Sequence, residues 1–215
     1  MDLVTDLQYC PTVTYFAYLH LAETVHLEAH ETFQKQTYRN RCTILNGGTP
    51  LSLTIPIVHK TRVKTIKEVE IDYTQKWQNQ HWRAIQSAYG KAPFFDYYAD
   101  DLKKEIYTNY TFLFDLNRNI LSLCLDSLQL SCIIDETSLY NKEVEAGVLD
   151  IRGLIHPKKE RAPHKCVAYN QHFGNDFVTD MSILDLLFCE GSNAYNIIIE
   201  ISTILKNELE LREIR

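Results

Sequence analysis

The chain has 215 residues, of which 45% are hydrophobic and 23% charged, and its formal net charge at pH 7 is -6. This length and composition predict a single domain over residues 1–215 with a substantial core, and the negative charge argues against duplex nucleic acid as a partner. No window approaches about 18 uninterrupted apolar residues, so we expect no membrane span.

The first residues and the cysteines predict a cytoplasmic location. The sequence begins MDLVTD, without the basic start and apolar stretch of a secretory signal. The six cysteines are scattered and form no C-x-x-C pair, so reduced thiols are expected and neither a zinc ribbon nor a redox motif is indicated.

The first thirty residues predict a strand, a helix and a second strand. Apolar residues favour a strand over 3–9, helical spacing follows over 15–22, and strand character returns over 24–28.

A β-hairpin is predicted next, with strands over 41–45 and 51–58. The Asn46-Gly47 pair between them supplies the positive φ angles that a tight turn needs. A further strand is expected over 61–72.

Helices dominate the remainder, around one long loop. Apolar periodicity predicts helices over 74–89, 95–107, 110–128 and 193–213. The stretch of about 141–171 has weak periodicity and several turn-forming residues, and we expect a long loop region there with one β element at most.

Two local signals mark helix ends in this half of the chain. Gly90 fits the left-handed position that ends a helix. Ser182–Asp185 resembles a capping box with Asp in place of Glu, which favours a capping role for Asp185.

These elements predict an α/β fold, with a Rossmann-like and mainly parallel sheet, an added β-hairpin and flanking helices. An α+β arrangement is the alternative. Ligands of parallel-sheet folds bind at the carboxyl ends of strands. This would place Tyr9 and Tyr15 near the site, with Glu28 and His30 at the end of the neighbouring strand.

The densest group of proton-handling side chains precedes the hairpin. Glu28 and His30 are candidates for general acid–base catalysis. On a strand they would share a face with His26, and two imidazoles with a carboxylate can also hold a divalent metal. The spacing is not a recognised metal motif, so we assign no metal; a solvated strand edge is the plain alternative.

Lys35, Arg39 and Arg41 follow within a few residues. Guanidinium groups form paired hydrogen bonds with phosphate or carboxylate oxygens, so this cluster predicts a clamp for an anionic group. A solvated basic edge strand is the alternative.

Two further residues lie in or just after the helix predicted over 74–89. His81 is on its apolar stripe, where a hydrogen-bonded core histidine is the commoner outcome than a catalyst. Lys91 follows the helix end, where it could reach the basic cluster or bind the last carbonyl groups of the helix.

Five segments, in this order, resemble the WbqC-like protein family. They are Tyr9–Phe16, Phe33–Arg41, Leu53–Pro56, Ala88–Phe95 and Met181–Gly191. The chain departs from the family pattern at two places. The family usually has Gln-Pro-x-Tyr-x-Pro at the start of the first segment, where this chain has DLQYCP. The family often has paired aspartates after its second strand, where this chain has Glu28-Ala-His30.

The resemblance implies a transferase of acyl, aminoacyl or glycosyl type that acts on sugar precursors in bacterial surface-polysaccharide (O-antigen) biosynthesis. Its substrate would be an anionic small molecule such as a nucleotide-sugar, and the sequence identifies no cofactor. The catalytic candidates are His30 and Glu28, and the substrate-binding candidates are Tyr9, Tyr15, Lys35, Arg39, Asn40, Arg41, His81 and Lys91.

The alternative function is a non-catalytic interaction protein. It would dock an acidic partner through the basic cluster or form a homodimer through its C-terminal helix.

Overall fold

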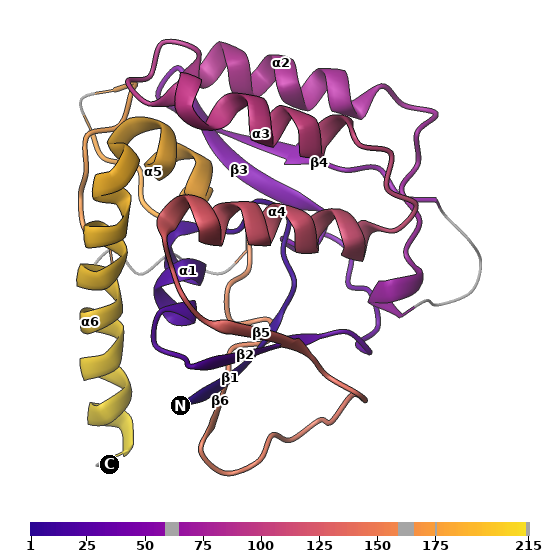
Figure 1. The fold of residues 1–215 in the computed structure, drawn as a ribbon, viewed down its shortest axis with the longest axis vertical. Coiled ribbons are helices and arrows are strands. Elements are labelled where there is room, and N and C mark those ends of the chain that lie inside the picture. The colour runs from indigo at the N-terminus through magenta and orange to yellow at the C-terminus, as the bar shows by residue number, and fades with distance from the viewer. Residues whose placement is uncertain (59–64, 159–165, 175, 214–215) are drawn as a thin grey trace.

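The structure is a computed structural model, and it describes residues 1–58, 65–158, 166–174 and 176–213. Its strands form a four-stranded parallel sheet and a separate two-stranded antiparallel sheet, with helices around both (Figure 1). The predicted α/β class is therefore confirmed.

The parallel sheet has the strand order β5-β2-β1-β6. Its members are β1 (Asp2–Asp6), β2 (Thr24–Glu28), β5 (Ile133–Glu136) and β6 (Val148–Asp150). β1 pairs with β2 on one side and with β6 on the other, so the sheet grows in opposite directions from β1. The register aligns Asp6 with Glu28, and both strands end at the same edge.

The two faces of this sheet have different surroundings. Leu3, Val25 and Leu27 are fully buried on the face that the helices cover. Asp2 and His26 alternate with them and stay partly exposed. Figure 1 shows α1 (Val13–Leu19) and α4 (Leu113–Leu128) above the sheet and the chain between β5 and β6 below it. A parallel sheet is usually covered by helices on both faces, so the open face is a natural place for a groove.

The hairpin consists of β3 (Arg41–Asn46) and β4 (Thr49–Thr54). Gly47 and Gly48 have φ angles of 58° and 79°, the two positive angles that a type I′ turn needs, so the predicted hairpin forms with its turn one residue later than the predicted Asn46-Gly47 pair. The hairpin does not extend the parallel sheet; β3 packs against α2 and α5 instead.

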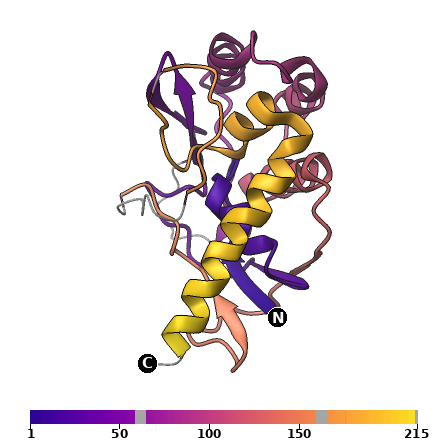
Figure 2. The same ribbon diagram turned by 90° about the vertical axis from the view of Figure 1, so that its left-hand side faces the viewer.

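The remaining helices build a layer beside the hairpin and one long side of the molecule. They are α2 (Trp77–Tyr89), α3 (Phe95–Tyr107), α5 (Ile183–Glu190) and α6 (Ala194–Glu213). α6 packs against α1 and runs along one side, with its C-terminal end beyond the sheet (Figure 2). Within the described ranges, no helix combines the length and apolar character that crossing a bilayer requires.

The strand predicted over 61–72 is wrong where the structure describes it. Residues 61–64 lie outside the described part, and a 3-10 turn, η1 (Ile66–Glu68), follows them. The Glu68 carboxylate accepts hydrogen bonds from the backbone N–H and the hydroxyl of Thr65, which closes the turn. These side-chain bonds compete with a sheet ladder, and in the described part of this stretch the pairing is limited to single bridges at Thr65, Glu70 and Ile71.

The two predicted helix-end signals also need correction. Gly90 has a right-handed φ of -61°, so a left-handed bend does not explain it. A Cβ at this position would lie 2.5 Å from the Gln86 carbonyl oxygen, and close packing of the helix end therefore demands glycine. Ser182 does cap α5, by accepting from the Leu184 N–H, but the Asp185 carboxylate binds Tyr169 and Gln171 instead of the helix end.

Candidate functional site

Charged side chains gather at the carboxyl ends of three parallel strands. Asp6 ends β1, Glu28 ends β2, and Arg152 follows β6 by two residues. Glu31 and Arg39 come from the chain after β2 and join the same group. Because the sheet grows in opposite directions from β1, this edge is where open α/β sheets bind ligands. We call these five residues the carboxylate–arginine cluster.

The centre of the cluster is a buried ion pair. Arg39 donates from Nε and Nη2 to the two carboxylate oxygens of Glu31, each at 2.6 Å. Its Nη1 lies 3.5 Å from Oδ2 of Asp6. Burial raises the pKa of Glu31 above its ordinary value, although the hydrogen bonds from Arg39 oppose this effect. Arg39 is therefore already engaged by two carboxylates of the chain.

Asp6 connects this ion pair to the neighbouring loops. Its Oδ1 accepts the Gly153 N–H at 2.7 Å, and its Oδ2 accepts the Gln8 side-chain amide at 3.1 Å. The Tyr15 hydroxyl donates to the Asp6 carbonyl oxygen at 3.2 Å. Burial raises the pKa of Tyr15, so this hydroxyl stays a neutral donor. The turn after β1 and the turn after β6 are thus fixed to each other through one carboxylate.

Glu28 forms the second half of the cluster. Its Oε1 accepts the His30 N–H and the Thr137 hydroxyl, both at 2.9 Å. Its Oε2 accepts Nη1 of Arg152, also at 2.9 Å. Arg152 holds the carboxylate of Asp150 as well and, against the effect of burial, lowers the pKa of Asp150 through these hydrogen bonds.

A groove of about 420 Å³ runs along the open face of the sheet to Glu28. Among the cluster residues, Glu28 and Arg152 line it. His26 lies between Asp2 and Asp135 in the groove, 4.0 Å from a carboxylate oxygen of each. The complete lining is Asp2, Val4, His26, Glu28, Asp135, Glu136, Thr137, Ser138, Leu139, Asn141, Val144, Glu145, Val148 and Arg152.

The structure separates the two predicted catalytic residues. Glu28 is buried and reaches the groove, whereas the His30 side chain is exposed and does not line it. His30 contributes its backbone N–H to Glu28. The sequence predicted that His26, Glu28 and His30 lie on one face of a strand. In the structure His26 and Glu28 share a face, but His30 does not, because β2 ends at Glu28.

The predicted anion clamp is also divided. Lys35 is exposed, Arg39 is buried in its ion pair, and Arg41 is half-buried at the start of β3. Asn40 donates its amide to the Ile55 carbonyl at 2.8 Å. Among the described residues, neither Nε of Arg41 nor Oδ1 of Asn40 has a hydrogen-bond partner, although both atoms are buried.

His81 has the environment of a core histidine. Its Nδ1 lies 3.0 Å from the Tyr9 hydroxyl and its Nε2 lies 3.2 Å from the Thr54 carbonyl oxygen. A carbonyl can only accept, so Nε2 carries the proton and Nδ1 accepts from Tyr9. Burial lowers the pKa of His81 to about 4 and raises that of Tyr9. The predicted binding residues Tyr9 and His81 thus bind each other.

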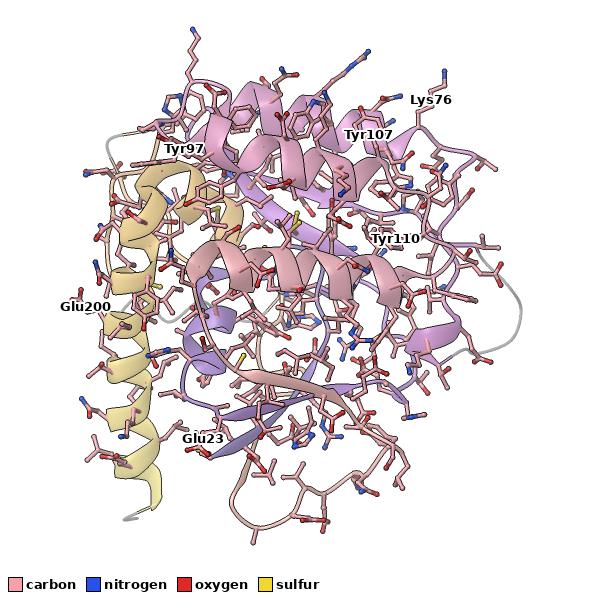
Figure 3. The ribbon with its side chains drawn as sticks, in the orientation of Figure 1. Glu23, Lys76, Tyr97, Tyr107, Tyr110 and Glu200 are labelled. Atoms are coloured by element: carbon pink, nitrogen blue, oxygen red, sulfur yellow. The ribbon has the colours of Figure 1, made fainter. Side chains whose placement is uncertain are left out.

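Lys91 and several tyrosines lie elsewhere. The Lys91 side chain is exposed just beyond α2. Tyr97, Tyr107 and Tyr110 surround α3 and the start of α4, away from the parallel sheet (Figure 3). Sequence reasoning assigned no site role to Asp6, Glu31 or Arg152. A charged residue inside the strand predicted over 3–9 was the available signal for Asp6, but Arg152 lies in the stretch predicted as a long loop and carried none.

The described residues contain no group of three His, Cys, Asp or Glu side chains arranged to hold a metal ion. His26 and Glu28 share a face, but the Glu28 carboxylate is held by Arg152 and its other donors. The chemistry that the cluster itself can perform is proton transfer and hydrogen bonding to a polar ligand.

Comparison with known proteins agrees with the resemblance seen in the sequence. The sequence model of the WbqC-like protein family matches residues 8–156, well over half of the chain. This range includes Glu28, Glu31, Arg39 and Arg152. Searches of curated proteins and of solved structures returned no match.

Proposed function

The chain belongs to the WbqC-like protein family, and from this premise we propose that it is a cytoplasmic transferase acting on sugar precursors of bacterial surface polysaccharide. The group transferred would be an acyl, aminoacyl or glycosyl group. The observation that carries the proposal is the position of Glu28, a buried carboxylate that reaches a groove at the carboxyl edge of a parallel sheet.

Glu28 is suited to the role of general base. A carboxylate has about four acceptor positions, and the described residues fill two on Oε1 and one on Oε2. The remaining position on Oε2 can accept the proton of a sugar hydroxyl or amine as that group attacks the donor. The bond from the donor to its leaving group breaks in the same process, and the leaving group departs with the electron pair. His30 follows the strand end, but its exposed side chain does not line the groove, so we propose Glu28 as the base and His30 as a backbone donor to it.

The anionic part of the substrate would bind through the segment 35–41. Arg41 supports this assignment because its buried Nε–H has no acceptor among the described residues. Lys35 adds an exposed positive charge nearby in the chain. Arg39 could take part only if its ion pair with Glu31 opened, because its side chain is 2% exposed and does not line the groove.

The proposal is tested by titrating the purified protein with nucleotide-sugars and with acyl and aminoacyl donors, and by assaying transfer to free sugars by mass spectrometry. We expect Glu28→Gln to bind the donor but to lose transfer by about 100-fold, the usual contribution of a general base. Glu136→Gln is the matched control, because Glu136 lines the same groove but pairs with Lys67 and Arg118. If no donor binds, or Glu28→Gln transfers at the wild-type rate, the proposal is rejected.

Self-association is a second candidate function, favoured by one observation on α6. A groove of about 570 Å³ lies between α6 and the end of α1, and it includes the half-buried Ile199 and Leu209. Leu211, near the end of α6, is 64% exposed. A dimer mass in light scattering that Leu211→Glu converts to a monomer mass would support this candidate, and a monomer mass for the wild type would reject it.

A further inference from the structure

The open side of the groove is formed by the chain between β5 and β6, and this wall has two attachments to Glu28. We call residues 137–147 the groove wall. At its start, the Thr137 hydroxyl donates to Glu28 and accepts the Ala29 N–H at 3.1 Å. Further along, Arg152 reaches both Glu28 and the backbone of the wall. The Glu28 carboxylate therefore binds the wall directly through Thr137 and indirectly through Arg152.

Arg152 uses its side chain completely. Nε and Nη2 donate to the two oxygens of Asp150 at 3.0 and 2.8 Å. Nη1 donates to Glu28 and to the Asn141 carbonyl at 2.8 Å, and Nη2 reaches the Lys142 carbonyl at 3.5 Å. An arginine has five N–H donors, so the described contacts account for all of them. The guanidinium also lies over the Tyr140 ring, 5.2 Å from its centre.

Because all five N–H donors of Arg152 already have acceptors in the protein, none is left to bind a substrate. We propose that Arg152 is a positioning residue: it fixes Oε2 of Glu28 at the groove and holds the wall in place over the same groove. The proposal rests on the proposed function insofar as Glu28 is taken as the catalytic base. It goes beyond that function because it couples the order of the wall to the placement of the base.

Lysine cannot replace arginine in this position. An ammonium group has a single centre and cannot reach Asp150, Glu28 and two carbonyl groups at once, although it keeps the positive charge. Arg152→Lys therefore separates charge from geometry, and Arg152→Gln removes both. Arg118→Gln is the matched control, because it also removes one arginine charge from an ion pair with a groove carboxylate, Glu136, but touches no wall residue in the described contacts.

The wall is measured by limited trypsin digestion, followed by mass spectrometry of the fragments that end at Lys142. Losing charge-assisted hydrogen bonds to the wall should accelerate this cleavage by about tenfold or more in both Arg152 variants. Arg118→Gln should be cleaved at the wild-type rate. If Arg152→Lys, which keeps the charge, is also cleaved at the wild-type rate, Arg152 does not hold the wall.

The position of Glu28 is read from the backbone amide signals of His30 and Ala29 in ¹H–¹⁵N NMR spectra, since these groups donate to Glu28 and to Thr137. We expect both signals to shift in Arg152→Gln, to shift less in Arg152→Lys and to stay in place in Arg118→Gln. Unchanged signals in a folded Arg152→Gln protein would overturn the positioning role. Both measurements need no substrate, so they can succeed while the donor titrations fail, and the two proposals are thereby tested separately.

Discussion

Arg39 and Glu31 form a paired, nearly solvent-free ion pair, with Nε and Nη2 each 2.6 Å from a carboxylate oxygen. Only 2% of the Arg39 side chain and 5% of that of Glu31 are exposed. The pair joins Asp6 at the carboxyl edge of β1, so three charges share one buried site. Two negative charges against one positive charge make Arg39 indispensable to this arrangement.

Removing Arg39 should therefore destabilise the protein strongly. In Arg39→Met, Glu31 and Asp6 would remain buried without a cation, and we expect a loss of about 3–5 kcal/mol in the free energy of unfolding. Urea denaturation followed by circular dichroism measures it. Arg118→Met, which removes a half-exposed arginine from its pair with Glu136, should cost no more than about 1 kcal/mol. Similar losses in both variants would contradict the burial of the ion pair between Arg39 and Glu31.

His81 should make stability depend on pH. The unfolded chain binds a proton at this histidine with a pKa near 6.5, whereas the folded protein does so only near 4. Between these values the unfolded state binds more protons, so stability is full above pH 6.5 and falls as the pH is lowered towards 4. The loss attributable to His81 is about 3 kcal/mol over the whole window and about 2 kcal/mol at pH 5.

The matched variant for this pH effect is His81→Gln. A glutamine can accept from Tyr9 and donate to the Thr54 carbonyl, but it does not titrate. Urea denaturation at pH 7 and pH 5 should therefore show a smaller loss for His81→Gln than for the wild type. An equal loss in the two proteins would mean that His81 is not buried in its neutral form.

Gly191, at the end of α5, should tolerate no side chain. Its φ is 55°, and a Cβ there would lie 2.4 Å from the Phe94 ring. Left-handed strain and overpacking together predict a loss of about 2–4 kcal/mol for Gly191→Ala in thermal or urea unfolding. Gly47 has a similar φ of 58° but open space around it, so Gly47→Asn should change stability by less than about 1 kcal/mol. A neutral Gly191→Ala would contradict the close contact with Phe94.

Asp185 should act as an acceptor for two donors. Its Oδ2 accepts the Tyr169 hydroxyl at 2.7 Å and the Gln171 amide at 2.8 Å, inside the protein. Asp185→Leu would leave the Tyr169 hydroxyl and one N–H of the Gln171 amide without an acceptor, while the bond from Gln171 to the Val178 carbonyl remains, and should cost about 2–4 kcal/mol. Asp185→Asn keeps one oxygen and should cost less. Urea unfolding of the two variants side by side measures this difference. Equal losses would show that packing, and not hydrogen bonding, is what Asp185 supplies.

Local signals were sufficient for much of the fold. The strand, helix and strand at the beginning are confirmed because apolar alternation and helical spacing there agree with the burial they receive. The predicted hairpin is confirmed, but its turn lies one residue later than predicted: Asn46 pairs with Thr49 at the end of β3, and the two positive φ angles fall on Gly47 and Gly48, which adopt them cheaply. The strand predicted over residues 65–72 is wrong because the hydrogen bonds that Thr65 donates to the Glu68 carboxylate close a turn that strand propensity does not reveal.

For the candidate site, the sequence by itself placed Glu28 at the end of a strand. It also showed His30, Lys35, Arg39 and Arg41 within one short segment. Both features can be read from the order of residues along the chain. Only the tertiary structure decided which charges are free. The turn after β2 brings Arg39 onto Glu31, and the parallel register brings Glu28 to Arg152, 124 positions further along. Whether a charge meets a ligand or another charge of the same protein depends on which strand ends share an edge of the sheet, and no local pattern of residues contains that information.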